Sequence, residues 1–198
     1  TSPATLNSAR RSLTSSGAGT STAGLITGGF QPPTTYSAIT ESWNGSAWTE
    51  VNDLNLGRQL LVMHGTQTAA LAAGGFKSTP AYEVNNVESW NGTSWTETTE
   101  INTARYKHGG SGTQTDFLIY GGLTPSITNI TESWNGTAWT EVNNLATGRS
   151  IGGDSGSGSS SSALASGGST DASPPGITTA TEEWSFSGLN PATTPAAD

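Results

Sequence analysis

Short runs of apolar residues recur along this chain at a nearly constant spacing. Four such runs each end at a pair of glycines, and they are Ala23–Thr27, Ala69–Ala73, Phe117–Tyr120 and Ala163–Ser166. The glycine pairs begin at Gly28, Gly74, Gly121 and Gly167, which are 46, 47 and 46 residues apart. A short, nearly continuous apolar run favours a strand that is covered on both faces. A period in the forties is typical of a repeat architecture.

A second motif follows each glycine pair and alternates in the manner of a β-hairpin. It reads TESWNGSAWTE at residues 40–50, VESWNGTSWTE at 87–97, TESWNGTAWTE at 131–141, and is shortened to TEEW at 181–184. The Asn-Gly dipeptide tolerates the positive φ angles of a tight hairpin turn. In the second repeat we therefore predict a four-stranded antiparallel meander, with strands at Gln59–Val62, Thr68–Ala73, Asn86–Trp90 and Trp95–Thr98. The tryptophans of each repeat are expected to form the core between neighbouring sheets.

This combination of motifs resembles the kelch repeat. The shared features are Gly-Gly at the end of an apolar strand, an aromatic residue about a dozen positions later, a Trp about five positions after that, and an Arg that opens the next unit. The resemblance implies an all-β fold, a kelch-like β-propeller of four four-stranded blades. Its repeats would span about 6–53, 54–100, 101–144 and 145–186, within a single domain at 1–186 that is followed by a C-terminal tail at 187–198. The chain departs from the family at Trp43, Trp90, Trp134 and Trp184, where kelch repeats usually have Tyr, and in having fewer blades than most kelch rings.

A ring of this kind needs an outer strand for its fourth blade. The fourth repeat lacks the second Trp, and residues 1–5 align with the end of the fourth strand of the other repeats. We therefore expect residues 1–5, or failing that 187–192, to supply this strand. An uncovered sheet edge would otherwise invite pairing with another chain.

The composition narrows the classes of partner. Charged residues make up 11% of the chain and the formal net charge is −8, which repels a phosphate backbone, so we expect no nucleic-acid partner. No apolar run approaches the roughly 18 residues of a membrane-spanning helix, so we expect no membrane span. The chain contains no cysteine, which fits an intracellular protein or a phage exterior protein that folds in a reducing cytoplasm. It begins at Thr1 without a signal-peptide pattern, so we expect either a removed leader or a piece of a longer chain.

One Arg and one Glu recur at a fixed position in every repeat. Because a guanidinium fork suits a carboxylate, we predict structural ion pairs at the blade junctions among Arg10, Arg58, Arg105, Arg149, Glu41, Glu88, Glu132 and Glu182. A glycosidase-like pair of carboxylates is the alternative. It is disfavoured because identical acids in every blade do not provide the two unlike environments that this chemistry needs.

The residues give little support for metal binding or catalysis. The two histidines, His64 and His108, lie near predicted turns, and we interpret them as turn or surface residues without a third metal ligand. Some kelch-like propellers are copper radical oxidases that use a Tyr–Cys cross-link, and the absence of Cys excludes that chemistry. No nucleophile elbow or phosphate-binding loop is present. We predict a non-enzyme with no cofactor and no metal.

Recognition is expected in the connections between the second and third strands, because these are where the repeats differ. They span residues 30–37, 76–85, 123–129 and 169–177. Aromatic faces suit sugars and other amphipathic ligands, so the candidate ligand-binding residues are Phe30, Tyr36, Phe76 and Tyr82.

The repeated motif, in which ESWNG and WTE recur between Thr- and Gly-rich stretches, is similar to kelch-like repeats in structural and tail-fibre proteins of marine bacteriophages. This resemblance implies a virion or extracellular location and host attachment, with partners among other virion or appendage proteins, a host-surface glycan or receptor, or further copies of the chain. Two alternatives stay open, a capsid or appendage decoration protein and a cellular kelch-type interaction scaffold.

Overall fold

The structure is a computed structural model that describes residues 4–13, 18–77, 82–150, 159–171 and 176–185. Within these residues the chain is all-β, with 18 strands and no helix. The strands form three four-stranded and three two-stranded sheets, and every pairing between them is antiparallel. The all-β class predicted from the repeats is confirmed.

Each of the first three repeats forms a four-stranded meander, as predicted. The first sheet contains β1 (Ala18–Thr20), β2 (Ala23–Thr27), β5 (Thr40–Trp43) and β6 (Trp48–Glu50). The second contains β7 (Val62–Thr66), β8 (Ala69–Ala73), β11 (Val87–Trp90) and β12 (Trp95–Thr98). The third contains β13 (Gly109–Gly112), β14 (Phe117–Tyr120), β15 (Thr131–Trp134) and β16 (Trp139–Val142). In the fourth repeat, β17 (Ser162–Ser166) pairs with β18 (Thr181–Ser185), and the neighbouring residues 151–158 and 186–198 lie outside the described part.

The first strand of the repeat begins later than the pattern predicts. In the second repeat it was expected at Gln59–Val62, but β7 starts at Val62. Leu60 interrupts the extended backbone with a φ of 57°, as do Ser12 and Lys107 at the corresponding positions. These residues link the repeats in series, because Leu60 N–H donates to the Ser12 carbonyl and Lys107 N–H donates to the Leu60 carbonyl, both at 3.1 Å. The contact between repeats thus overrides the local preference for a strand.

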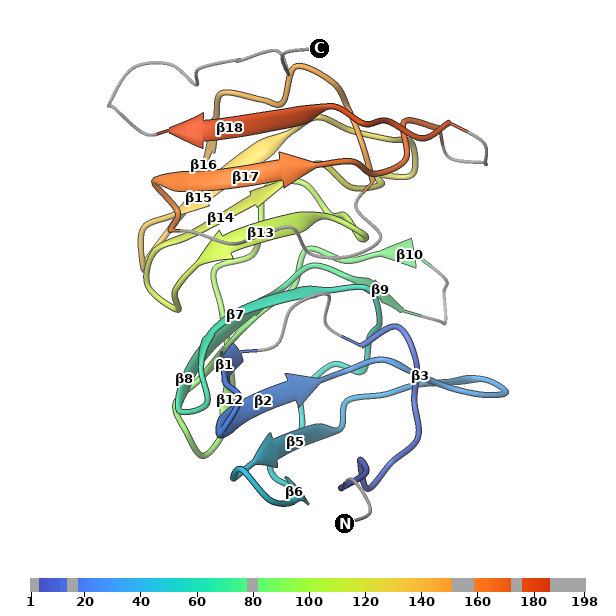
Figure 1. Cartoon of the computed structure of the whole chain (residues 1–198), viewed down its shortest axis with the longest axis vertical. Helices are drawn as coiled ribbons and strands as arrows, with labels where there is room; N and C mark the ends of the chain where they lie inside the picture. The colour runs from blue at the N-terminus through green and yellow to red at the C-terminus, as the bar shows by residue number, and fades with distance from the viewer. Residues whose placement is uncertain (1–3, 14–17, 78–81, 151–158, 172–175, 186–198) are drawn as a thin grey trace.

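Two of the variable connections contain hairpins that the sequence did not predict. In the first repeat β3 (Phe30–Gln31) pairs with β4 (Thr35–Tyr36), and in the second β9 (Phe76–Lys77) pairs with β10 (Tyr82–Glu83). Both hairpins begin directly after a glycine pair, where the chain leaves the main sheet. They project on the same side of the molecule (Figure 1).

The sheets follow one another in sequence order along the long axis of the molecule, from β5 and β6 at one end to β17 and β18 at the other (Figure 1). The first strands of the first three sheets, β1, β7 and β13, contact one another in series, and β13 also contacts β17, which is the second strand of the fourth repeat. A closed ring of four blades stays a prediction. Of the expected closing segment at residues 1–5 only Ala4 and Thr5 are described, and they form no strand, while 187–192 lies outside the described residues.

The core lies between successive sheets and contains the tryptophans. In each of the first three repeats the third-strand Trp pairs across the hairpin with the fourth-strand Trp, with ring centroids 5.3 Å apart. Trp90 and Trp95 pack against the first sheet together with Leu25 and Met63, and Trp134 and Trp139 pack against the second sheet in the same way. Between the third and fourth sheets, Trp184 packs with Leu118 and Tyr120 but has no tryptophan opposite it.

Candidate functional site

The glycine pairs position the variable connections. Both glycines of each pair have positive φ, for example 62° at Gly74 and 118° at Gly75, so the chain turns sharply out of the sheet. The residue that follows each pair then forms an antiparallel bridge with the residue that follows the repeated Arg. These bridges are Arg11 with Phe30, Gln59 with Phe76, Tyr106 with Leu123, and Ser150 with Ser169. Each repeat therefore presents two variable side chains at the same place on one side of the molecule.

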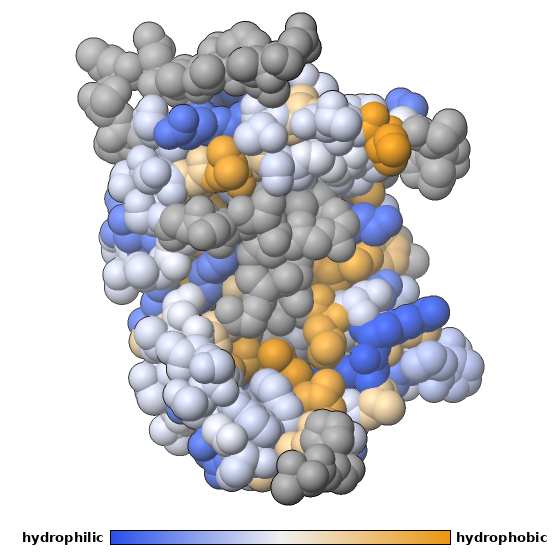
Figure 2. Space-filling view, in the orientation of Figure 1, coloured by the Kyte–Doolittle hydropathy of each residue, from blue (hydrophilic) through white to orange (hydrophobic). Residues whose placement is uncertain are grey.

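At this place the first three repeats form a continuous line of rings, which we name the aromatic row: Phe30, Tyr36, Phe76 and Tyr106. Phe30 meets Tyr36 edge-to-face at 5.2 Å between ring centroids. Tyr36 reaches Phe76 of the next repeat at 6.1 Å, and Phe76 reaches Tyr106 of the third repeat at 5.0 Å. All four rings are half-buried. Figure 2 shows apolar residues gathering on the side from which the hairpins project, with strongly hydrophilic residues beside them.

Charged groups border the aromatic row at both ends. The guanidinium of Arg11 lies 5.1 Å from the centre of the Phe30 ring. At the other end burial raises the pKa of the Tyr106 hydroxyl above its ordinary value, and the negative charge of Glu83 raises it further. The Tyr106 hydroxyl thus stays protonated to a higher pH than that of a free Tyr and can donate a hydrogen bond to a ligand.

Three of the four candidate ligand-binding residues are brought together, and the fourth stands apart. Phe30, Tyr36 and Phe76 are members of the aromatic row, whereas the ring of Tyr82 is 37% exposed and lies 4.6 Å from the Lys77 ammonium. Sequence reasoning missed Tyr106 because it belongs to no variable connection. The signal that identifies it is its position directly after a repeated Arg, where every repeat has a different residue.

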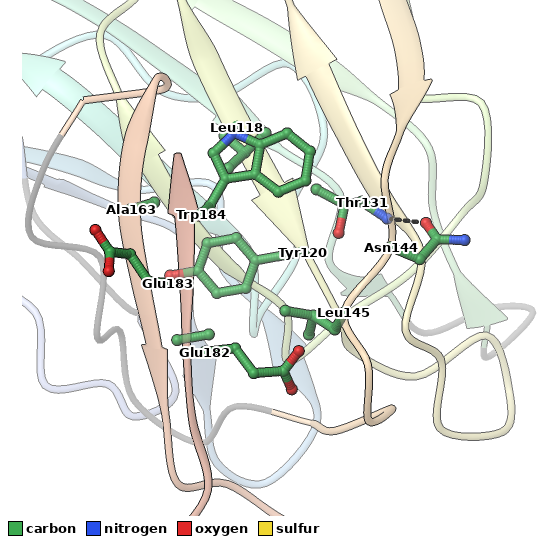
Figure 3. A pocket seen from close by; sticks show the side chains of 10 residues that line it. Leu118, Tyr120, Thr131, Asn144, Leu145, Ala163, Glu182, Glu183 and Trp184 are labelled. Atoms are coloured by element: carbon green, nitrogen blue, oxygen red, sulfur yellow. Dashed lines mark hydrogen bonds between the residues drawn. The ribbon is translucent and has the colours of Figure 1, made fainter. Parts of the chain in front are cut away.

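A pocket lies between the third and fourth sheets (Figure 3). Its walls include Leu118 and Tyr120 of β14, Thr131 of β15, and Trp184 of β18. The Thr131 N–H donates to Asn144 Oδ1 at 2.9 Å. The pocket is mainly apolar, yet two of its buried polar atoms, Thr131 Oγ1 and Trp184 Nε1, have no hydrogen-bond partner among the described residues.

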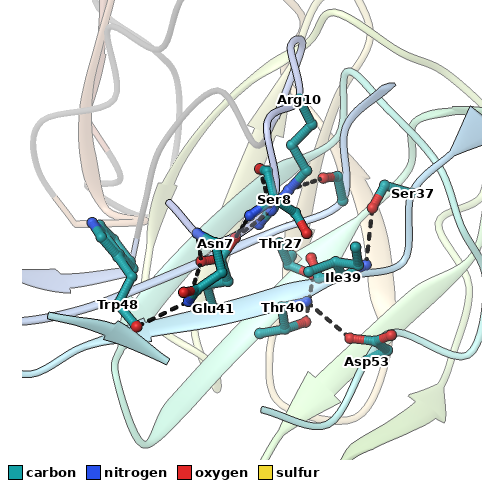
Figure 4. A network of polar contacts seen from close by, with 11 residues as sticks. Asn7, Ser8, Arg10, Thr27, Ser37, Ile39, Thr40, Glu41, Trp48 and Asp53 are labelled. Atoms are coloured by element: carbon teal, nitrogen blue, oxygen red, sulfur yellow. Dashed lines mark hydrogen bonds and ion pairs between the residues drawn. The ribbon is translucent and has the colours of Figure 1, made fainter. Parts of the chain in front are cut away.

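Each repeated Arg forms a salt bridge with the Glu of its own repeat. The pairs are Arg10–Glu41, Arg58–Glu88, Arg105–Glu132 and Arg149–Glu182. The side chains of the first three pairs are fully buried, and only the Glu182 side chain is slightly exposed, at 14%. In the first network, Asn7 donates to Glu41 from both its backbone and its side chain (Figure 4).

The repeated Arg also joins each repeat to the previous one. The carbonyl of Arg58 accepts a hydrogen bond from Gly29 of the first repeat at 2.9 Å, while its side chain donates to the carbonyl of Gly74 in the second repeat, also at 2.9 Å. Arg105 and Arg149 repeat this arrangement with the following glycine pairs. Each repeated Arg thus bonds the previous repeat through its backbone carbonyl and its own repeat through its side chain.

Burial and hydrogen bonding act against each other at these charged groups. Burial lowers the pKa of Arg58 and of Arg105, and the facing carboxylates of Glu88 and Glu132 oppose this. Burial also disfavours the charged form of Glu41, but hydrogen bonds from Asn7 and Arg10 outweigh it and hold the pKa of Glu41 below its ordinary value. The fold therefore favours the paired, charged state of Glu41.

The histidines differ from the sequence interpretation. His64 lies within β7, 5.2 Å from Phe117 between ring centroids, and His108 is 1% exposed rather than on the surface. His108 is buried because its ring packs against Gly74, where a Cβ would come within 2.7 Å of it. Among the described residues, no group of three or more His, Cys, Asp or Glu side chains is placed to hold a metal ion. In the same residues no helix is long and apolar enough to span a membrane.

Comparison with known proteins adds no family assignment. Neither a protein-family model nor a curated protein sequence matches this chain.

Proposed function

We propose that this chain is a non-enzymatic binding module of the kelch-like propeller type, displayed on a virion surface or fibre, that contacts a host surface molecule such as a glycan. The observation that carries the proposal is the aromatic row, in which four half-buried rings from three repeats each lie within 6.1 Å of the next, measured between ring centroids. The virion location rests on the likeness of the repeated phrase to phage structural and tail-fibre proteins.

The chemistry of the row suits a sugar. The faces of Phe and Tyr rings provide apolar contact, and the Tyr hydroxyls provide hydrogen bonds, so the same surface meets both the C–H face and the hydroxyls of a sugar ring. The rings belong to short strands and bridges, which fixes them before the ligand arrives and lowers the entropic cost of binding. The row spans three repeats, so a ligand of several sugar units would contact more of it than a single sugar.

The test is a glycan array probed with the full chain, followed by titration of the best ligand. Tyr36→Ala removes the ring that joins the first and second repeats, and loss of one ring contact is expected to cost about 0.5–1.5 kcal/mol, which corresponds to a Kd weaker by roughly twofold to twelvefold. Ile177→Ala is the matched control, because Ile177 is 82% exposed at the corresponding connection of the fourth repeat, outside the row. Equal losses in both variants, or no glycan bound at all, would contradict the proposal.

A decoration or assembly role is the second candidate function. It is favoured by apolar side chains of the first and fourth sheets that are more exposed than their counterparts between sheets. Trp43 and Trp48 of the first sheet are half-buried, whereas their counterparts Trp90 and Trp95 are buried between sheets. At the other end Leu164 is 42% exposed, whereas its counterpart Leu25 is 1% exposed. Light scattering across a concentration series measures self-association, and mass spectrometry of purified particles tests whether the chain is a virion component.

The four-bladed ring is part of the same proposal. If residues 1–5 close the ring as the outer strand of the fourth blade, deleting them exposes a sheet edge. The deletion should then lower the Tm or cause association. A variant with an unchanged Tm that stays monomeric would exclude this closure.

A further inference from the structure

Three cations remain once the repeated ion pairs are set aside, and all three stand at the aromatic row. The chain has seven Lys and Arg residues, of which four are the buried partners of the repeated Glu residues. The other three are Arg11, Lys77 and Lys107. None of them forms a salt bridge within the described part of the chain. Their charges are therefore available to a ligand.

Two of these cations are held against aromatic rings. The backbone of Arg11 exchanges two hydrogen bonds with Phe30, at 3.0 and 2.7 Å, and its guanidinium lies 5.1 Å from the centre of the Phe30 ring. Lys77 follows Phe76 in β9, and its ammonium lies 4.6 Å from the centre of the Tyr82 ring in β10. A cation over the face of a ring keeps N–H groups that point away from the ring. These N–H groups can donate to an anion at the edge of the row.

The third cation, Lys107, comes one residue after Tyr106 of the row. Its backbone N–H donates to the carbonyl of Leu60 at 3.1 Å, and the residue before Leu60, Gln59, pairs with Phe76. These contacts place the backbone of Lys107 beside the second repeat. Its exposed side chain thus starts from the part of the row where the Phe76 and Tyr106 rings meet.

Rings and cations are distributed over the repeats in the same way. Each of the first three repeats contributes at least one ring of the row and one of the three cations. In the second and third repeats the cation directly follows the ring, as Lys77 follows Phe76 and Lys107 follows Tyr106. In the fourth repeat the connection at 169–177 has neither an aromatic residue nor a cation. The surface with the rings is thus also the surface with the free positive charges.

The net charge of −8 gives little information about the charge of this surface. Much of the negative charge lies elsewhere, since Glu50, Glu97 and Glu141 are on the fourth strands of their sheets. Glu83 in β10 is a carboxylate that acts on the row, because its charge raises the pKa of the Tyr106 hydroxyl. Interactions between exposed charges are largely screened beyond about 8 Å at physiological salt. A bound anion therefore responds mainly to the three cations beside it and to Glu83.

We propose that the aromatic row binds an anionic oligosaccharide, one with carboxylate or sulfate groups on successive sugars, and that Arg11, Lys77 and Lys107 bind these groups. The inference rests on the proposed function of the row in sugar binding and adds the charge of the sugar. A chain of charged sugars fits because each of three successive repeats offers a ring for the apolar face and a cation for the anion. The guanidinium of Arg11 can donate two parallel hydrogen bonds to one anionic group, and the lysines act as point charges. A nucleic-acid strand fits less well, because its longer run of charges also meets the negative charge of the rest of the chain.

The test is isothermal titration calorimetry of the full chain with two matched pairs of oligosaccharides. The first pair is an oligomer of galacturonic acid and its carboxyl-reduced form, in which each carboxylate is an alcohol. The second pair is a sulfated galactan oligomer and its desulfated form. In at least one pair the charged member is expected to bind roughly tenfold more tightly at physiological salt, and the difference should shrink as salt is added. The pair that shows the difference identifies carboxylate or sulfate as the recognised group.

Variants that remove one charge each assign the effect to residues. Arg11→Gln, Lys77→Gln and Lys107→Gln should each weaken the Kd of the charged member roughly twofold to fivefold and leave that of the neutral member unchanged. Thr93→Asp is the matched control, because it makes the same change in net charge in the exposed Asn-Gly turn at the opposite end of the second sheet. It should leave both affinities unchanged. Tyr36→Ala, by contrast, should weaken the binding of both members.

The outcomes separate this inference from the proposed function. Equal affinity within both pairs, with Tyr36→Ala weakening every member, would overturn the anionic ligand and keep the sugar-binding row. An equal loss in Thr93→Asp and in the three variants would attribute the effect to net charge and overturn the inference as well. Tighter binding of a Glu-rich peptide or of single-stranded DNA than of any oligosaccharide would overturn both. No binding of any oligosaccharide would overturn the inference, and the glycan array would then decide the proposed function alone.

Discussion

Replacing Arg58 by Ala tests whether the repeated charges hold the fold together. The Arg58 side chain is fully buried and donates to Glu88 at 2.5 Å, to the Gly74 carbonyl at 2.9 Å and to the Leu56 carbonyl at 3.0 Å. Alanine would leave the Glu88 carboxylate buried without its counter-charge. Breaking a buried pair in this way typically costs about 3–5 kcal/mol. Backbone and side-chain N–H groups of Asn55 still reach Glu88, at 2.7 and 2.9 Å, which places the expected loss near the lower end of that range.

Equilibrium unfolding in urea, followed by tryptophan fluorescence, measures this loss. For a chain of this size about 3 kcal/mol corresponds to a fall in Tm of roughly 6–12 °C. Arg149→Ala should be milder because its partner Glu182 is 14% exposed and water can solvate it. Arg11→Ala is the surface control, since the exposed Arg11 side chain lies over the Phe30 ring in a cation–π arrangement worth about 0.5–1 kcal/mol.

A stability loss below about 1 kcal/mol in Arg58→Ala would refute the reasoning. The corresponding variant Arg105→Ala separates the two interpretations of these residues. A protein that folds normally but loses binding would place the arginines in a functional site rather than in the scaffold.

Three further predictions follow from individual contacts. The pKa of Glu41 is lowered in the folded state, so the stability it contributes is complete above about pH 4.5 and is lost as the pH falls through the folded pKa, and Glu41→Gln should flatten that part of a Tm-against-pH curve. Gly74→Ala should cost more in urea unfolding than Gly167→Ala: their φ angles are 62° and 63°, but only at Gly74 does a Cβ come within 2.7 Å of a carbonyl, that of Arg105. Tyr82→Ala should leave the unfolding free energy within about 0.5 kcal/mol of wild type, because the ring is exposed, and should weaken attachment to the target surface in a binding assay.

Local signals in the sequence predicted the second, third and fourth strands of the repeat well. The strand predicted at Trp95–Thr98 is β12 itself, and β8 begins one residue after its predicted start. The Asn-Gly turns form because Gly92 has a φ of 91° and the side chain of Asn91 accepts hydrogen bonds from the turn backbone. These features depend on residues close together in the chain, so a single repeat contains the information for them.

The start of each repeat, between the repeated Arg and the first strand, depends on contacts between repeats. The sequence pattern predicted this part less well. Leu60 takes a left-handed conformation in order to bond Ser12 of the previous repeat, which no local preference predicts. Tyr106 also depends on the previous repeat, because it joins the aromatic row through Phe76. The pairing of each Arg with a Glu was predictable because both recur at a fixed position in every repeat, whereas three of the four rings of the aromatic row were candidates and Tyr106 was missed, because the members of the row differ from repeat to repeat.

Each repeated Arg bonds two successive repeats, one through its backbone and one through its side chain, and this affects how such a chain can gain or lose repeats. Each Glu is followed 17 residues later by the next Arg, as Glu41 is by Arg58, Glu88 by Arg105 and Glu132 by Arg149. A crossover within one of these 17-residue intervals exchanges whole charge pairs and leaves no buried ion without its partner. An in-register crossover anywhere else still leaves one Glu for each Arg, but it joins an Arg to the Glu of a different repeat. Duplication or loss of units with the breakpoint in one of these intervals keeps every charge pair in the surroundings that it has in this chain, and we expect relatives with different numbers of units to join there.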